Sequence, residues 1–161
     1  MLLMKFNLQT YNFSYSIRQG KRGRGTAAIC IDALRLRDVS LDDFSSFEYH
    51  AVILKCLFAA IVCRPPKHCP NVLSDLSELL SIISSNYDNI IIIADSNLHT
   101  DNNTDKKASD FSHLLEDLSF IQHVNEPTHS CGQTLDLVTT RGLSADISSV
   151  MDVLLSDHLL N

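Results

Sequence analysis

The sequence predicts an α/β fold in which strands outnumber helices. Short apolar runs rich in Ile, Val and Ala alternate along the chain with two segments of helical period. One of these runs, Asn89–Ala94, contains four consecutive isoleucines. A run that is apolar at every position is typical of a strand buried on both faces, so we expect it at the centre of a sheet. In an α/β fold, a sheet packs either on a second sheet or on a layer of helices, and periodicity alone leaves both arrangements open.

The individual elements follow from local pattern. Asn71–Ser85 is predicted to be a helix because Leu73, Leu76 and Ile83, with Leu79 or Leu80, share one face. Ser109–Ser119 is amphipathic in the same way through its Phe and Leu residues. The glycine-rich stretch 20–25 is expected to be a flexible turn. The expected strands are Thr26–Ile31, Phe47–Lys55, Leu57–Val62, Asn89–Ala94, Ile121–Val124, Thr134–Val138 and Ile147–Leu155.

Composition excludes several classes of protein. The chain has 161 residues with 45% hydrophobic residues, which fits a single globular domain over 1–161 and argues against wholesale disorder. The net charge of −6 gives no global attraction to nucleic acid or anionic membrane. Positive charge is instead clustered between Arg18 and Arg24, where a solvated loop and a phosphate-contacting loop are both open interpretations.

Five cysteines form no C-x-x-C pair, so neither a zinc ribbon nor a redox motif is predicted. Free thiols in a reducing compartment fit better than a metal pair at His68 and Cys69. No apolar run reaches the roughly 18 residues of a membrane span, and Met1–Phe6 is too short for a secretory signal. We therefore expect a soluble, intracellular protein of the nucleus or cytoplasm, without a membrane partner.

The first candidate site follows the isoleucine run, where Asp95 and Asn97 stand two residues apart. In an extended segment, residues two apart point the same way, so one carboxylate and one amide would be presented together. A carboxylate can position or deprotonate a water, and an amide can hold that water or a phosphate oxygen. The alternative is an ordinary turn, which Asp and Asn both favour.

Two further candidates lie downstream. Asp157 and His158 follow the last apolar run, and they offer an oxygen ligand for a hard cation and a general acid or base. A frayed C-terminus is the alternative. Asp136 stands in the run Thr134–Val138, where a buried carboxylate requires a partner and a histidine is a natural one.

Taken in order, these motifs resemble the endonuclease/exonuclease/phosphatase superfamily. The resemblance rests on Arg64-Pro65-Pro66, Ile90–His99, Pro127-Thr128-His129, Thr134–Val138 and Ser156-Asp157-His158. It is strongest to the apurinic-type endonuclease of animal non-long-terminal-repeat retrotransposons, and it spans about residues 11–158. The family fold is a four-layer α/β sandwich of two packed mixed sheets with outer helices, and the family reaction is Mg²⁺-dependent hydrolysis of DNA phosphodiesters.

The resemblance also implies roles for individual residues. Asp95 matches the carboxylate that activates the attacking water, and Asn97 matches the amide that orients the water or the phosphate. Asp157 would contribute to the Mg²⁺ environment. His158 would contact the scissile phosphate, and Asp136 would hold His158.

Several family features have no match here. The family opens with a strand bearing an Asn and then a metal-binding Glu, whereas the first Glu here, Glu48, comes at a different point in the order. Cys63 stands where a Tyr usually serves the phosphate, Ser96 where a Phe is usual, and Ala94 where a Gly is usual. No closing strand follows His158. We therefore expect a truncated copy, incomplete at both ends, that is inactive or weakly active, with a non-catalytic binding module of the same fold as the alternative.

Overall fold

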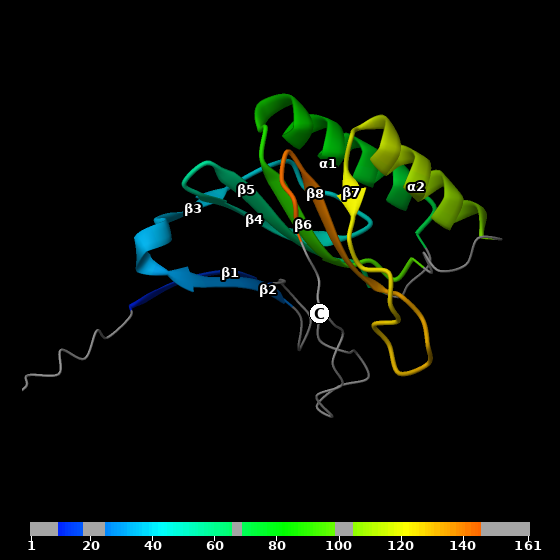
Figure 1. Cartoon of the computed structure of the whole chain (residues 1–161), viewed down its shortest axis with the longest axis horizontal. Helices are drawn as coiled ribbons and strands as arrows, with labels where there is room; N and C mark the ends of the chain where they lie inside the picture. The colour runs from blue at the N-terminus through cyan, green and yellow to red at the C-terminus, as the bar shows by residue number, and fades with distance from the viewer. Residues whose placement is uncertain (1–9, 18–24, 66–68, 99–104, 146–161) are drawn as a thin grey trace, which may run out of the picture.

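The computed structural model describes residues 10–17, 25–65, 69–98 and 105–145. They form a six-stranded sheet with two helices on one face and a two-stranded sheet against part of the other (Figure 1). The expected α/β sandwich is confirmed, and the described residues make up three of its layers. The strand predicted over Ile147–Leu155 lies outside the described residues.

The larger sheet is mixed and has the order β3-β4-β5-β6-β8-β7. Strands β5 and β6 pair in parallel, and the other neighbours pair antiparallel. A parallel pair needs a crossover connection, which helix α1 (Val72–Asn86) provides. Helix α2 (Lys106–Asp117) follows β6. The strands are β3 (Leu36–Val39), β4 (Glu48–Leu54), β5 (Leu57–Cys63), β6 (Ile90–Asp95), β7 (Ile121–Gln122) and β8 (Asp136–Arg141).

The main core lies between the helices and this sheet. Strand β5 shows the alternation that a half-buried strand requires, with Phe58, Ala60 and Val62 buried. Helix α1 buries Leu79, Leu80 and Ile83 against them, on the face that its sequence period predicts, and α2 adds Phe111 and Leu115. The helix-facing side of the sheet is therefore apolar.

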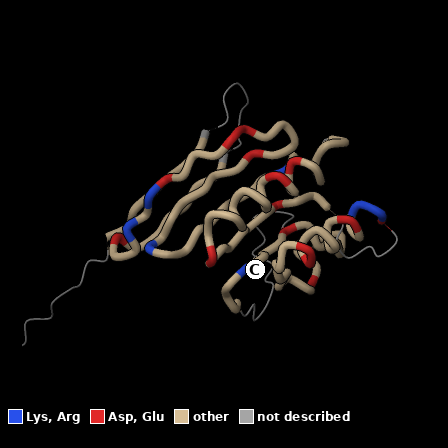
Figure 2. Tube along the Cα trace, turned by 90° about the horizontal axis from the view of Figure 1, so that it is seen from above, with Lys and Arg blue, Asp and Glu red and all other residues tan. Residues whose placement is uncertain are grey.

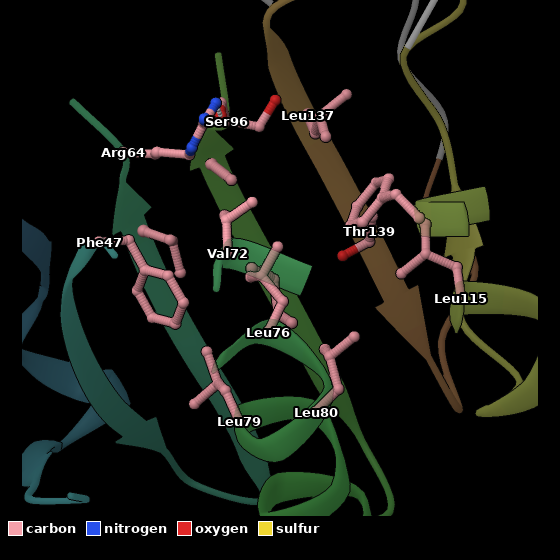
Figure 3. A pocket seen from close by; sticks show the side chains of 14 residues that line it. Phe47, Arg64, Val72, Leu76, Leu79, Leu80, Ser96, Leu115, Leu137 and Thr139 are labelled. Carbon is pink, nitrogen blue, oxygen red and sulfur yellow. Dashed lines mark hydrogen bonds between the residues drawn. The ribbon is translucent and has the colours of Figure 1, made fainter. Parts of the chain in front are cut away.

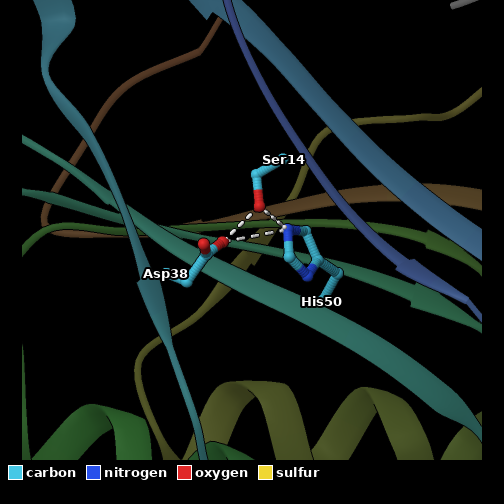
Figure 4. A network of polar contacts seen from close by, with 3 residues as sticks. All are labelled: Ser14, Asp38 and His50. Atoms are coloured by element: carbon cyan, nitrogen blue, oxygen red, sulfur yellow. Dashed lines mark hydrogen bonds and ion pairs between the residues drawn. The ribbon is translucent and has the colours of Figure 1, made fainter.

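The smaller sheet is an antiparallel pair of β1 (Tyr11–Ile17) and β2 (Gly25–Ile31). A 3₁₀ turn, η1 (Asp32–Leu34), leads from β2 into β3. The pair lies against β3, β4 and β5. One cluster joins the two sheets: the Ser14 hydroxyl donates to Asp38 and lies 2.8 Å from Nε2 of His50 (Figure 4).

The structure corrects the expectation that β6 is buried on both faces. Strand β6 is interior to the sheet, between β5 and β8, as predicted. However, only Ile90 and Ile92 are buried, and 49% of Ile93 is exposed. The reason is that the two-stranded sheet lies against β3 to β5, so the second face of β6 is left largely uncovered.

Strands β1 and β3 were not predicted. In β1, aromatic residues alternate with Asn and Ser, but the aromatic side chains point outward, with 62% of Tyr11 exposed. Strand β3 is only four residues long and carries Arg37 and Asp38, which hide its pattern. Helix α2 begins three residues earlier than predicted because the Asp105 side chain accepts a hydrogen bond from the Lys107 amide, an N-cap interaction.

Candidate active site

The candidate site lies at one edge of the larger sheet, where four neighbouring strands begin or end. Strand pairing places Glu48, Cys63, Asp95 and Asp136 in a single row, each opposite the next. We call these four residues the edge row. Residues paired in register point to the same face, so the row lies on the side away from the helices. Three of its four members are carboxylates.

Asp95 and Asn97 are brought together, but not by the extended geometry that the sequence suggested. Strand β6 ends at Asp95, and Asn97 has a left-handed backbone with φ 46°, a conformation that Asn tolerates better than most residues. Its side-chain amide donates to Asp95 Oδ1 at 3.0 Å and to the Arg64 carbonyl at 2.7 Å. The two side chains are therefore paired, as predicted, although the segment that follows Asp95 is irregular rather than extended.

Arg64 braces this turn from the end of β5. Its side chain donates to the carbonyls of Ser96 and Asn97 at 3.1 and 2.8 Å, and its own amide donates to the Asp95 carbonyl at 2.9 Å. Only 7% of Arg64 is exposed. A buried guanidinium with these acceptors fixes the backbone that follows Asp95, so this arginine has a positioning role.

Asp136 is the first residue of β8 rather than an interior one, which corrects the expectation of a carboxylate within an apolar strand. Its Cα is paired with that of Asp95 across the antiparallel register. The hydroxyl of Thr128, which is fully buried, accepts from the amides of Leu135 and Asp136 at 3.0 and 2.9 Å. Thr128 therefore sets the backbone position from which Asp136 starts.

Ser96 joins the two halves of the site. It stands where the family has a Phe, and only 6% of it is exposed. Its hydroxyl donates to the Leu135 carbonyl at 2.8 Å and accepts from the Leu98 amide at 3.1 Å. The end of β6 is thereby tied to the segment that enters β8.

A cavity on the opposite side of the sheet is not a substrate site. It lies between the helices and the sheet, is lined mainly by apolar side chains, and has Arg64 and Ser96 at one end (Figure 3). Its volume is about 30 Å³, which is room for about one water. This cavity is therefore too small for a nucleotide.

The five predicted site residues divide into two groups. The structure brings Asp95, Asn97 and Asp136 to one edge, whereas Asp157 and His158 lie outside the described residues. Their convergence with the other three, and the pairing of Asp136 with His158, stay predictions. The His68–Cys69 metal pair, the less favoured interpretation, also falls partly outside, since His68 is not among the described residues.

The donors at this edge are of the kind that Mg²⁺ prefers. Carboxylate and amide oxygens are hard ligands, and Mg²⁺ usually takes one or two carboxylates and keeps several waters. Asp95, Asp136 and the Asn97 carbonyl oxygen meet that requirement. Among the described residues, no group of three or more His, Cys, Asp and Glu side chains is placed to hold a metal.

Three supporting residues were missed at the level of sequence. The three are Arg64, Thr128 and Ser96. All three lie in motifs that carried the resemblance, but each makes its hydrogen bonds to residues more than five positions away in the sequence. Glu48 was set aside because of its position in the order, yet strand pairing brings it into the edge row. Two strand spacings still separate it from Asp95, about 10 Å between Cα atoms.

Comparison with known proteins places this architecture. No protein-family model matches the sequence, and no curated protein matches it. Among solved structures, the endonuclease domain of TRAS1, a telomere-specific non-LTR retrotransposon, matches with a TM-score of 0.61 over 92% of this chain and 75% of that chain. The chain has the fold of a retrotransposon endonuclease domain. At 18% sequence identity the likeness establishes the fold and leaves the chemistry to be argued from the site.

The five cysteines all lie within the described ranges, and none of them forms a disulfide. In the part of the chain that the structure describes, no helix combines the length and apolar character needed to cross a bilayer.

Proposed function

We propose that the chain is a retrotransposon-derived, Mg²⁺-dependent DNA phosphodiesterase of low activity, acting inside the cell. The observation that carries this proposal is the pairing of Asp95 with Asp136 on adjacent strands, with Asn97 hydrogen-bonded to Asp95. Two partly exposed carboxylates and an amide at one sheet edge can take up a proton, hold a water and bind a cation. The TRAS1 endonuclease domain shares the architecture that produces this edge.

The roles that we propose follow from these contacts. Asp95 accepts the proton of the attacking water, and Asn97, held in place by the Arg64 carbonyl, orients that water or a phosphate oxygen. Asp136 orients His158, which would hydrogen-bond to the scissile phosphate. Arg64 and Thr128 act through backbone position and do not touch the substrate.

The residues that would hold Mg²⁺ are Asp157, the edge-row carboxylates Asp95 and Asp136, and the side-chain oxygen of Asn97. A bound Mg²⁺ offsets the negative charge that builds on the phosphate during hydrolysis. Low activity is proposed because the edge row contains a cysteine at position 63, directly opposite Asp95. A thiol is a weak hydrogen-bond donor, and loss of one preorganised donor costs on the order of a hundredfold in rate.

A plasmid-nicking assay tests the proposal. The wild-type chain should nick supercoiled DNA slowly in Mg²⁺ and not in EDTA, and Asp95→Asn should abolish nicking. Cys63→Tyr should raise the rate because it restores a phenolic donor next to Asp95, whereas Cys56→Tyr, at an exposed cysteine on the β4–β5 turn, should not. Nicking that survives Asp95→Asn would show that the edge row is not the active site.

One observation favours a second candidate, a DNA-binding module without catalysis. The described residues hold no three-group metal cluster. If this candidate is correct, duplex DNA binds equally well in Mg²⁺ and in EDTA, and Cys63→Tyr produces no nicking.

A further inference from the structure

A cleft at the other end of the larger sheet is lined by cations. Arg35, Arg37 and Lys55 together line an open space of about 420 Å³. Arg35 follows η1, Arg37 lies on edge strand β3, and Lys55 is in the turn between β4 and β5. All three side chains are exposed. Lys and Arg positions gather at this end of the tube in Figure 2, on the left, in a chain of net charge −6.

The carboxylates next to this cleft in sequence are engaged elsewhere. Asp32 accepts from the Asn12 side chain at 2.7 Å. Asp38 accepts from Ser14 and lies 3.4 Å from His50 (Figure 4). Within the described ranges, no salt bridge involves Arg35, Arg37 or Lys55. Three cations therefore share one cleft without being neutralised there by carboxylates of the described chain.

We infer that this cleft binds the phosphate backbone of DNA, at a distance from the edge row. Exposed cations gain little from a single small anion, because water and salt screen each pair. A polyanion is different, since each cation that contacts a phosphate releases condensed counterions and adds to affinity. Three exposed cations in one open cleft thus favour a nucleic-acid backbone over a single phosphate.

The position of the cleft fits a duplex that also reaches the edge row. Strand β4 starts at Glu48, in the edge row, and ends at Leu54, next to Lys55. Six steps at about 3.3 Å each separate the two ends by roughly 20 Å. That length corresponds to about six base pairs at 3.4 Å each. The cleft and the edge row are therefore about half a helical turn of duplex apart, so one duplex passing over the outer surface is long enough to reach both.

The experiment compares two charge-matched double variants. Arg35→Asn with Lys55→Asn removes two cations from the cleft, and Asn suits both positions because Arg35 and Lys55 have left-handed backbones with φ 51° and 58°. Lys106→Gln with Lys107→Gln removes two cations from the start of α2 as a control. Binding of a fluorescent duplex about two helical turns long is measured by anisotropy in EDTA, between about 50 and 200 mM salt.

The cleft variant should lower the slope of log affinity against log salt by about 2, and the control should leave the slope unchanged. Equal slopes for the two variants, tighter binding of RNA than of DNA, or saturable binding of inorganic phosphate at the cleft would overturn the inference.

The inference rests on the proposed function for its ligand, but the two fail separately. If Asp95→Asn leaves nicking intact while the cleft variant weakens binding, the active-site proposal fails and the cleft stands. If the two charge variants bind alike while Asp95→Asn abolishes nicking, the reverse holds.

Discussion

At the scale of single residues, the candidate site depends on a few buried polar groups that hold backbone in place. Thr128 receives two amide hydrogen bonds at the start of β8, and Arg64 donates two to the turn after β6. A buried amide that loses its acceptor bears a desolvation cost that no solvent contact offsets. Site geometry and stability are therefore coupled at these residues.

Thr128→Val tests that coupling. The two side chains have similar shape, so the change removes the acceptor of the Leu135 and Asp136 amides without opening a cavity. We expect a loss of about 2 kcal/mol in the free energy of unfolding, measured in urea. Thr128→Ser keeps the hydroxyl and should lose clearly less. Equal stability of the Val and Ser variants would show that the hydroxyl does not support β8.

Tyr49 gives a test at high pH. Burial raises the pKa of its phenol, and the Leu41 amide that donates to the phenol oxygen opposes this only in part. Because the folded-state pKa lies above the unfolded value, the contribution to stability is full below about pH 10 and is lost as the pH rises through the folded-state pKa. Tyr49→Phe should therefore lose less stability than wild type as the pH rises above about 10, whereas Tyr11→Phe, at an exposed tyrosine, should follow the wild type. A Tyr49→Phe curve parallel to wild type would contradict this.

Residue patterns predicted the polar side chains of the site but not the buried residues whose hydrogen bonds hold its backbone in place. Asp95, Asn97 and Asp136 were found because carboxylates and amides beside apolar strands are chemically informative. Arg64 and Ser96 act through hydrogen bonds to carbonyls more than thirty positions away, and no local pattern encodes such contacts. The left-handed backbone of Asn97 was also hidden, since the strand pattern says nothing of the backbone conformation of the residues that follow it.

At the scale of elements, the hairpin of β4 and β5 shows how local conformation departs from local preference. The two strands are joined by Lys55 and Cys56, and of these only Lys55 has a positive φ, 58°. Two-residue hairpin turns with positive φ at the first central residue favour glycine there. Lys55 therefore adopts a left-handed backbone conformation that is sterically unfavourable for a residue with a Cβ atom.

Lys55→Gly should accordingly stabilise the chain by about 1 kcal/mol, because glycine removes the steric cost of the left-handed conformation. Cys56→Gly is the matched control, since that residue does not need a positive φ, and it should be neutral or destabilising. Thermal unfolding of the two variants provides the measurement. A lower midpoint for Lys55→Gly than for Cys56→Gly would contradict the turn assignment.

Elements were predictable where one face is strongly apolar. Helix α1 and strands β5 and β6 lie within two residues of their predicted bounds, because burial against the core imposes a clear period. Strand β3 is a short charged edge strand, and the aromatic side chains of β1 point outward. Both are specified by pairing with a neighbouring strand rather than by their own burial pattern.

At the scale of the whole molecule, the two sheets are joined by the Ser14 cluster. Ser14 is buried, and its hydroxyl bridges Asp38 on β3 and His50 on β4. The outer side of the β1–β2 pair is exposed, with 59% of Phe13 and 67% of Ile29 accessible. This pair therefore depends on its inward polar contacts for its place on the larger sheet.

Ser14→Ala should loosen the β1–β2 pair selectively. Loss of about 1.4 kcal/mol at this junction corresponds to a tenfold larger equilibrium constant for local opening of the β1–β2 pair. In native-state hydrogen exchange, β1 and β2 amides should exchange about tenfold faster, while β5 and β6 amides should be unaffected. Ser16→Ala, at an exposed position on the same strand, is the control. Uniform acceleration in every strand would mean that the sheets unfold as one unit.

We propose that the edge row is the metal-dependent site of this chain, and Mn²⁺ titration followed by NMR is a direct test of that claim. Mn²⁺ substitutes for Mg²⁺ at hard oxygen ligands and broadens nearby amide resonances whether or not the chain turns over DNA. We predict that the amides of Asp95, Ser96, Asn97 and Asp136 broaden first, and that Asp95→Asn with Asp136→Asn removes the effect. If the first resonances to broaden are those of Asp42 and Asp43 or of Glu116 and Asp117, with the edge row unchanged, the claim is wrong.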